Sequence, residues 1–255
     1  MNSRILVAIA LSLFVLVASG QSALADTFRI EIDYMVDEGI GGHSHMPTQQ
    51  EIDAVVQMFA CQGHTLIIEL SDQIPHYTTL VRDPDNCGAS LFSYAGANNS
   101  YLALKNEYYD HAGESGWHYC IFAHMYQDRD CITTDSSGLA ELSGDDFIVT
   151  LGDFDFDTGT PFEKASTLAH EFGHNLGLSH CGNQLCWGDE TDDNNVGPRK
   201  VNLPSVMSYF YQLRGVRHNM VCQGIAPADG GIYRDLDYSH GRMCTLYETA
   251  LDESW

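Results

Sequence analysis

Positive charge is scarce in this chain. Its 255 residues include 12 lysines and arginines against 35 aspartates and glutamates, and only three of the basic residues are lysines. Nucleic acids and anionic membranes bind clusters of basic side chains, so we expect neither as a partner. The excess of carboxylates is typical of a solvated surface that keeps a protein soluble. It is also compatible with calcium binding, a saline habitat or a basic substrate.

Long apolar runs are absent except at the N-terminus. Arg4 precedes an apolar run over residues 5–18, and Ala-Leu-Ala at residues 23–25 has the small-x-small pattern of a cleavage site. This order is typical of a secretory signal peptide, and the run is shorter than the ~20 residues that a membrane span needs. We predict a signal peptide over residues 1–25 and a secreted protein, extracellular or periplasmic, with no membrane span in residues 26–255.

No C-x-x-C pair occurs, which excludes the usual spacing of a zinc ribbon. All eight cysteines follow residue 25, and an even number in a secreted chain predicts disulfides. The sequence does not determine their connectivity. In one alternative, Cys181 or Cys186 bonds to Cys222 or Cys244. Pairing near neighbours instead gives Cys61–Cys87, Cys120–Cys131, Cys181–Cys186 and Cys222–Cys244.

The most specific pattern is His-Glu-x-x-His-x-x-Gly-x-x-His over residues 170–180. His170 and His174 share one face of a helix, so both can bind the same metal ion. Gly177 tolerates the positive φ that lets the chain leave the helix and bring His180 back as a third ligand. Three histidine ligands leave one coordination position open, which is typical of catalytic rather than structural zinc.

Glu171 directly follows the first of these histidines. Its carboxylate is placed to accept a proton from a water molecule at the metal, which predicts a general base for hydrolysis. Five fixed residues at fixed offsets rarely coincide. We therefore interpret the pattern as a zinc site rather than as ordinary histidines of an amphipathic helix.

The motif resembles that of the metzincin clan of zinc endopeptidases. Residues 205–209, Ser-Val-Met-Ser-Tyr, are similar to the methionine-containing turn of that clan. The resemblance implies that Met207 forms a floor beneath the metal. It also implies that Tyr209 is the tyrosine that binds the metal and stabilises the transition state in astacin-like and serralysin-like members. The nonapeptide calcium repeats of serralysins are absent.

The resemblance covers nearly all of residues 27–253 and implies an α/β (α+β) fold. A twisted, mostly parallel sheet would pack on the active-site helix in residues 26–180. A smaller, irregular or helical C-terminal subdomain would span residues 181–255, with the cleft between the two. Residues 138–142 would form a rim strand, and a substrate would add to the edge of Gly138, Leu139 and Ala140 as an extra strand.

Hydrophobic patterning predicts a βαβ unit near the N-terminus. Residues 28–34 alternate like a half-buried strand, and they begin so soon after the cleavage site that we expect no propeptide. Thr48 and Glu51 form a capping box before an amphipathic helix, and residues 65–70 form a parallel strand. We further expect an irregular region over 71–116 with a strand near 90–94, strands at 117–125 and 146–151, the zinc helix at 162–176, and helix from 236 to 253.

Four other histidines receive simpler interpretations. His43 and His45 could hold a second metal, but a solvent loop is favoured for this Gly-rich stretch. His118 and His124 are interpreted as packed side chains, because the three protein positions of the metal are already filled.

An oxygen-rich segment follows the third histidine ligand. Asp189, Glu190, Asp192 and Asp193 lie where pappalysin-like metzincins carry a calcium loop, which implies a Ca²⁺ site, with a solvated loop as the alternative. The aspartates of residues 153–157 lack the glycine and final glutamate of an EF-hand, which excludes that motif.

These observations predict a secreted zinc endopeptidase that acts as a monomer on a protein or peptide substrate. Two alternatives stay open: a catalytically silent or latent binding protein with the metzincin fold, and a zinc enzyme with a narrow non-protein amide substrate. The intact Glu171 favours catalysis, because pure binding requires no general base.

Overall fold

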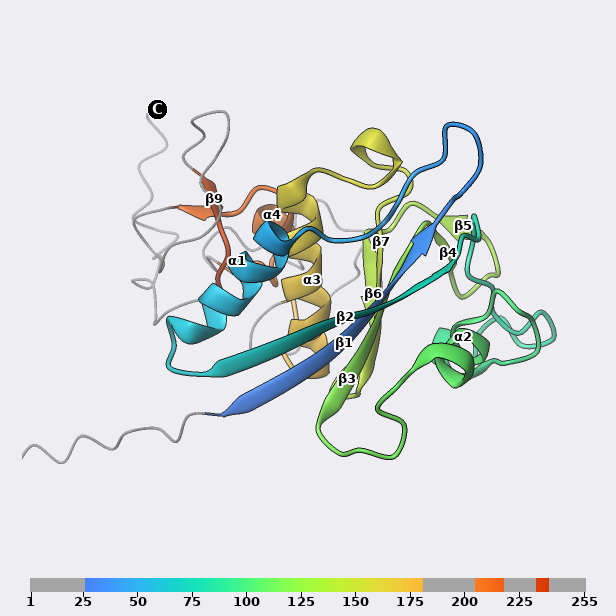
Figure 1. Ribbon diagram of the computed structural model, residues 1–255, viewed down its shortest axis with the longest axis horizontal. Helices are drawn as coiled ribbons and strands as arrows, with labels where there is room; N and C mark the ends of the chain where they lie inside the picture. Colours follow the sequence, from blue (N-terminus) through green and yellow to red (C-terminus); the bar gives the residue numbers. More distant parts are fainter. Residues whose placement is uncertain (1–25, 181–204, 218–232, 239–255) are drawn as a thin grey trace, which may run out of the picture.

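A mostly parallel sheet forms the centre of the computed structural model, which describes residues 26–180, 205–217 and 233–238 (Figure 1). The first four strands in the sheet are parallel, and the last, β6, runs antiparallel to β7 at the edge. This mixture of helices and parallel strands confirms an α/β fold. The strand order is β2 (Thr65–Pro75), β1 (Thr27–Val36), β3 (Trp117–Ala123), β7 (Asp146–Thr150) and β6 (Gly138–Ala140).

Helices lie on both faces of the sheet (Figure 1). α1 (Gln49–Ala60) and α3 (Pro161–Asn175) pack on one face, and α2 (Tyr101–Tyr108) packs on the other. The predicted parallel β1–α1–β2 unit and the capping box at the start of α1 are confirmed. The remaining elements are 3₁₀ turns at Leu91–Ser93 and Asp155–Asp157, α4 (Tyr209–Gln212), β4 (Tyr126–Gln127) paired with β5 (Thr133–Thr134), and β8 (Val216–Arg217) paired with β9 (Tyr233–Asp235).

Aromatic side chains join α1 to α3 above the sheet. The Phe172 ring of α3 lies 5.6 Å from that of Phe59 in α1 and 6.1 Å from that of Phe28 in β1, between ring centroids. Phe28 and Phe59 meet edge-on at 5.4 Å. Such aromatic pairs contribute beyond the area they bury, so the cluster fixes the helix that carries the zinc motif against the rest of the core.

The strand β1 is buried on both faces, so the prediction of a half-buried strand is wrong. The side chains of Glu31 and Asp33 are fully buried. Glu31 accepts the backbone N–H of Asp110 at 3.0 Å, and Asp33 accepts the Tyr119 hydroxyl at 2.5 Å. The second face is covered by packing around α2, a short helix that the sequence pattern did not predict.

Two further expectations for the chain are corrected. Residues 90–94 contain a 3₁₀ turn instead of a strand, because the Ser90 hydroxyl accepts the backbone N–H of Phe92 and turns the chain. Residues 236–238 are not helical. The rest of the predicted C-terminal helix and the predicted signal peptide lie outside the described residues.

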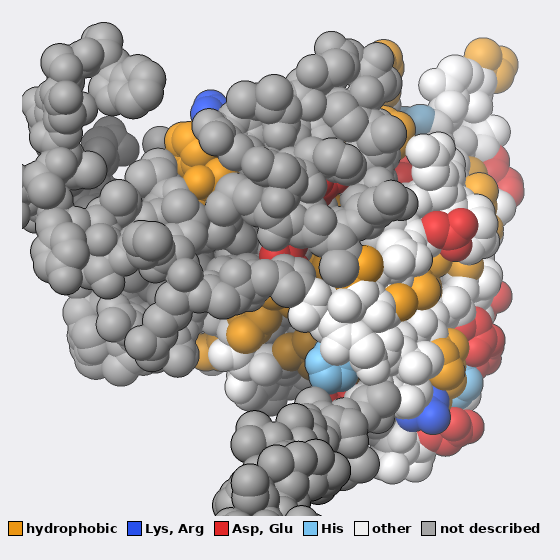
Figure 2. Space-filling view, turned by 90° about the vertical axis from the view of Figure 1, so that its left-hand side faces the viewer, with side chains coloured by type: hydrophobic (Ala, Val, Ile, Leu, Met, Phe, Trp, Pro, Cys, Tyr) orange, Lys and Arg blue, Asp and Glu red, His pale blue; other side chains and the backbone are white. Residues whose placement is uncertain are grey.

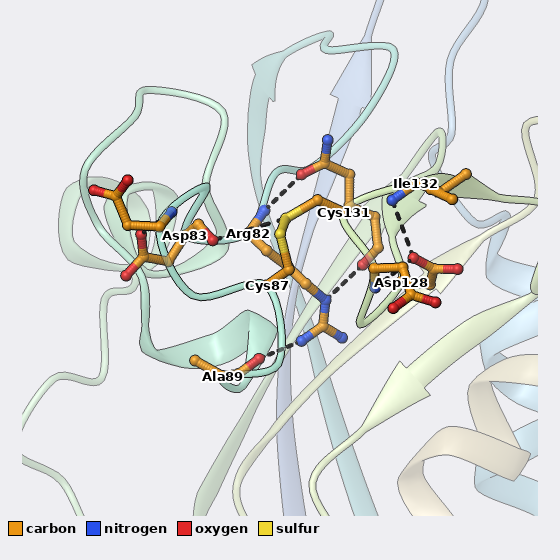
Figure 3. The surroundings of a disulfide bond; sticks show 10 residues. Arg82, Asp83, Cys87, Ala89, Asp128, Cys131 and Ile132 are labelled. Atoms are coloured by element: carbon orange, nitrogen blue, oxygen red, sulfur yellow. Dashed lines mark hydrogen bonds between the residues drawn. A yellow bond between two sulfur atoms is a disulfide. The ribbon is translucent and has the colours of Figure 1, made fainter.

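Cys87 bonds to Cys131, with 5.3 Å between their Cα atoms (Figure 3). The predicted pairs Cys61–Cys87 and Cys120–Cys131 are therefore wrong. Cys120 is fully buried in the core, whereas the loops of Cys87 and Cys131 meet around Arg82, whose guanidinium donates to the carbonyls of Ala89 and Gln127. The pairs Cys181–Cys186 and Cys222–Cys244, and the alternative linking these cysteines, lie outside the described residues.

Glu31→Gln should make the stability of the protein less dependent on pH. Burial is the main cause that raises the pKa of Glu31 from 4.5 to about 7. The folded chain therefore keeps a proton that the unfolded chain releases, and stability is lost as pH rises from the unfolded to the folded pKa. Wild type should lose up to about 3 kcal/mol more than the variant in this window. Urea unfolding at about pH 4.5 and about pH 8 measures this; parallel losses in both proteins would contradict it.

Candidate metal centre

The helix α3 begins and ends as its sequence predicts. The Thr160 side chain accepts the backbone N–H of Glu163, whose carboxylate accepts the N–H of Thr160, and Pro161 occupies the first turn. Gly177 has φ +85°, so the chain turns there and returns His180 toward the helix. The structure thus assembles the three predicted ligands as the motif implies.

The three histidines point their Nε2 atoms at one another. His170 Nε2 lies 3.2 Å from that of His174 and 3.2 Å from that of His180. The Nε2 atoms of His174 and His180 are 2.9 Å apart. Ligand nitrogens of a tetrahedral zinc, at Zn–N about 2.0–2.1 Å, lie about 3.3–3.4 Å from one another. The set therefore has the size of one face of a zinc coordination shell.

Backbone carbonyls determine which nitrogens carry protons. His170 Nδ1 donates to Val206 O at 2.7 Å, and His174 Nδ1 donates to Leu178 O at 2.8 Å. A neutral imidazole has one N–H, so both Nε2 atoms present lone pairs. Burial lowers the pKa of His170 well below its ordinary value and that of His180 to about 3. Uncharged lone pairs facing each other at this distance fit a bound cation.

Glu171 is buried beside these ligands, only 4% exposed. Burial raises the pKa of its carboxyl well above the ordinary value. It lies against the edge strand: a Cβ on Gly138 would come within 2.7 Å of Glu171 Oε1 and 2.6 Å of Ile148 O. Only glycine leaves room for the carboxylate here, a close approach that the sequence pattern did not predict.

Met207 and Tyr209 lie on different sides of the histidines. Met207 is buried under α3, where a Cβ on Gly173 would come within 2.4 Å of its Sδ atom. Tyr209 is 44% exposed, and its ring centroid lies 4.3 Å from that of His180. The ring of Tyr209 thus lies beside the histidines, whereas the floor position of Met207 beneath a metal and the chemical roles of both residues remain predictions.

The strand β6 presents its outer side to a pocket of about 230 Å³. Gly138, Leu139 and Ala140 form this strand, which ends the sheet order and pairs only with β7 among the described residues. Leu139 and Ala140 line the pocket together with residues 88–92. Residues 88–92 directly follow Cys87, whose disulfide bond to Cys131 fixes the start of this segment (Figure 3). On this edge Gly138 O accepts the hydroxyls of Tyr126 at 3.2 Å and Ser136 at 3.3 Å. The part of the edge after Gly138 O, beside the pocket, is what remains for an extended chain.

A second group of histidines lies at the other end of α3. His45 is only 2% exposed, so the prediction of a solvent loop for His43 and His45 is wrong. Both face His76 and His124, so His124 is not simply a packed core residue. His118 is packed as predicted, with its ring edge-on to Phe172 at 4.9 Å between centroids.

The predicted calcium loop lies outside the described residues, including its four acidic side chains Asp189, Glu190, Asp192 and Asp193. Figure 2 shows acidic side chains along the described part of one face with hardly any lysine or arginine among them, as the composition predicts. Among the described helices, none is long and apolar enough to cross a membrane.

No protein-family model matches the chain, and no curated protein or solved structure shows a significant likeness to it.

Gly173→Ala should destabilise the protein although alanine is the better helix former. In a free helix the change gains about 1 kcal/mol. Here the added methyl would lie 2.4 Å from Met207 Sδ and 2.9 Å from Tyr238 Cε1, and such overpacking costs about 1–3 kcal/mol. Urea unfolding should show a net loss of up to about 2 kcal/mol. Gly88→Ala is the control, because its Cβ would meet nothing within 4 Å. A stabilised Gly173→Ala protein would mean that Met207 does not pack beneath α3.

Proposed function

We propose that the protein is a secreted, zinc-dependent endopeptidase of the metzincin type. One observation carries the proposal: three histidine Nε2 atoms within 3.2 Å of one another lie beside a buried glutamate that packs against the edge strand β6. A binding protein would need only the metal ligands or only the edge strand. A hydrolase also needs a general base near the metal, and Glu171 would supply it.

His170, His174 and His180 would hold the zinc ion. The carbonyls that accept from the Nδ1 atoms of His170 and His174 orient the two rings, so little rearrangement is needed on binding. When bound, zinc supplies a Lewis acid that polarises the scissile carbonyl and acidifies water.

Glu171 is the general base of the proposed reaction. Its burial makes the carboxylate a stronger base than an exposed glutamate. One of its oxygens takes a proton from the attacking water as the C–O bond forms. The same proton then passes to the leaving amine nitrogen as the C–N bond breaks.

The strand β6 would hold the substrate as an additional strand. Backbone groups on its outer edge pair with an extended peptide, and the pocket beside Leu139 and Ala140 receives one of the peptide side chains. Because Gly138 lies against Glu171, a peptide on this strand brings its carbonyl carbon near the base. Tyr209, whose ring lies 4.3 Å from that of His180 between centroids, would donate its hydroxyl to the oxyanion.

The covalent structure is compatible with secretion. The Cys87–Cys131 bond is of a kind that persists in oxidising compartments and is rare in the cytosol. It agrees with the N-terminal pattern of Arg4 and the apolar residues 5–18.

Glu171→Gln should remove peptide cleavage while zinc binding is retained. Gln keeps the shape of the side chain and cannot accept the proton, which should lower kcat/KM by about 10²–10⁴-fold. Digestion of a proteome-derived peptide library by the zinc-loaded proteins measures this, with a chelated wild type as the blank. If the variant cleaves at the wild-type rate, Glu171 is not the base. If folded, zinc-loaded wild type makes no cuts, the endopeptidase proposal is contradicted, and a silent or latent binding protein or an enzyme for a non-protein amide takes its place.

Tyr209→Phe should lower kcat by about 10²-fold and leave KM near the wild-type value, because the hydroxyl acts on the charge that develops only in the transition state. Tyr211→Phe is the matched control, since it removes a hydroxyl from the same helix, α4, at a buried position with no part in the proposed reaction. An unchanged kcat for Tyr209→Phe would remove this residue from the chemistry.

A further inference from the structure

Four histidines from distant parts of the chain meet where the parallel strands end. His76 directly follows β2, and His124 directly follows β3. His43 and His45 lie in the loop after β1, which folds back so that the His45 N–H donates to Met35 O at 2.9 Å. Because the carboxyl ends of parallel strands lie at one edge of the sheet (Figure 1), the three connections converge there.

The ring nitrogens of this group have the spacing of a coordination shell. His43 Nε2 lies 3.1 Å from His45 Nε2 and 3.3 Å from His124 Nδ1. His45 Nε2 and His124 Nδ1 are also 3.3 Å apart. One nitrogen from each of the four histidines lies within 4.8 Å of the others. The three separations among His43, His45 and His124 match the tetrahedral edge of about 3.3–3.4 Å at least as closely as those of the first centre do, and His76 lies near enough to complete the set with a small movement of its ring.

Hydrogen bonding alone does not satisfy these nitrogens. A ring nitrogen is either a donor or an acceptor, so in a triangle of three at least one contact joins two lone pairs or two N–H groups. The triangle of His43, His45 and His124 therefore contains a repulsive contact. In addition, His76 Nε2 is buried with no hydrogen-bond partner. A cation at the centre would accept lone pairs from all of them.

We propose that His43, His45, His76 and His124 form a second, structural zinc site. Imidazole nitrogens suit Zn²⁺, whereas Ca²⁺ and Mg²⁺ require oxygen ligands, of which the set has none. Four protein ligands close a tetrahedral shell and leave no position for a substrate or reacting water. The site thus differs in kind from the three-histidine centre, which leaves one position open.

Acidic residues around the group balance the charge of a divalent ion. Burial, the main cause, lowers the pKa of both His76 and His124. The carboxylate of Asp37 acts in the opposite direction on His76, and those of Asp157 and Asp153 do so on His124. Among the described residues, Lys164, which pairs with Glu51, is the one positive side chain that acts on His45. The three carboxylates outnumber it, so the surroundings of these neutral ligands favour a cation.

The site would stabilise the connection that leads into α3. The Gly152 N–H donates to His124 O at 2.9 Å, and a Cβ on Gly152 would come within 2.6 Å of His124 Nδ1. Residues 151–160 then run from this contact to the first turn of α3, where Lys164 pairs with Glu51 of α1 at 3.7 Å. The ion would join three loops at one end of the helix whose other end carries His174.

Zinc content separates the two sites without any assay of activity, and it does not depend on the proposed function. Purified chains are loaded with excess Zn²⁺, desalted and measured by elemental mass spectrometry. Wild type should hold about two ions, His45→Ala and His174→Ala about one each, and the double variant essentially none. His64→Ala, a histidine outside both groups, should keep about two.

Two further variants distinguish loss of the second zinc site from a general loss of folding. Gly152→Ala should displace the His124 ring and lower zinc occupancy of the second site, whereas Gly88→Ala, which meets no atom within 4 Å, should not. In each variant the ion retained at the three-histidine centre reports that the fold is intact.

Thermal unfolding tests the structural role. Excess zinc should raise the Tm of wild type, and His45→Ala should lose most of this rise while His174→Ala keeps most of it. A folded His45→Ala protein that holds as much zinc as wild type would overturn the proposal and leave the four histidines as a packed cluster. A wild type with one ion, lost in His45→Ala and kept in His174→Ala, would support this site and contradict the three-histidine centre instead.

Discussion

The constraint on which the site depends is the mutual approach of uncharged nitrogens. Backbone carbonyls take the single proton of His170 and of His174 at Nδ1, so their lone pairs face each other across 3.2 Å. In a protein interior such an arrangement is unfavourable unless a cation lies between them. The fold around α3 acts to hold this arrangement: a capped N-terminus, a Gly177 turn and an aromatic cluster around Phe172.

The remaining geometry brings the buried carboxylate of Glu171 and the edge strand β6 together beside the three histidines. Two glycines, which have no Cβ atom, make this possible. Without a Cβ at Gly138, Glu171 reaches the edge strand, and without one at Gly173, Met207 lies directly beneath α3. The same helix leads from the four-histidine group at its start to the three-histidine centre at its end, so one element connects a proposed structural ion to a proposed catalytic one.

Local spacing made part of this predictable. The ligands His170–His180, the positive φ of Gly177 and the capping box of α1 all depend on residues within one or two turns. The second histidine group was not predictable, because His43 and His124 are 81 positions apart and meet only through the register of parallel strands. The Cys87–Cys131 bond and the burial of Glu31 likewise depend on contacts distant in the sequence.

A crystal structure of the zinc-loaded protein with a peptide hydroxamate tests the central claim most directly. The account predicts zinc bound to the Nε2 atoms of His170, His174 and His180, the hydroxamate at the open position, and the peptide extended along the outer edge of β6 near Glu171. Zinc absent from these three histidines would contradict the metal centre. Zinc present with the peptide bound away from β6 would contradict the proposed mode of substrate binding.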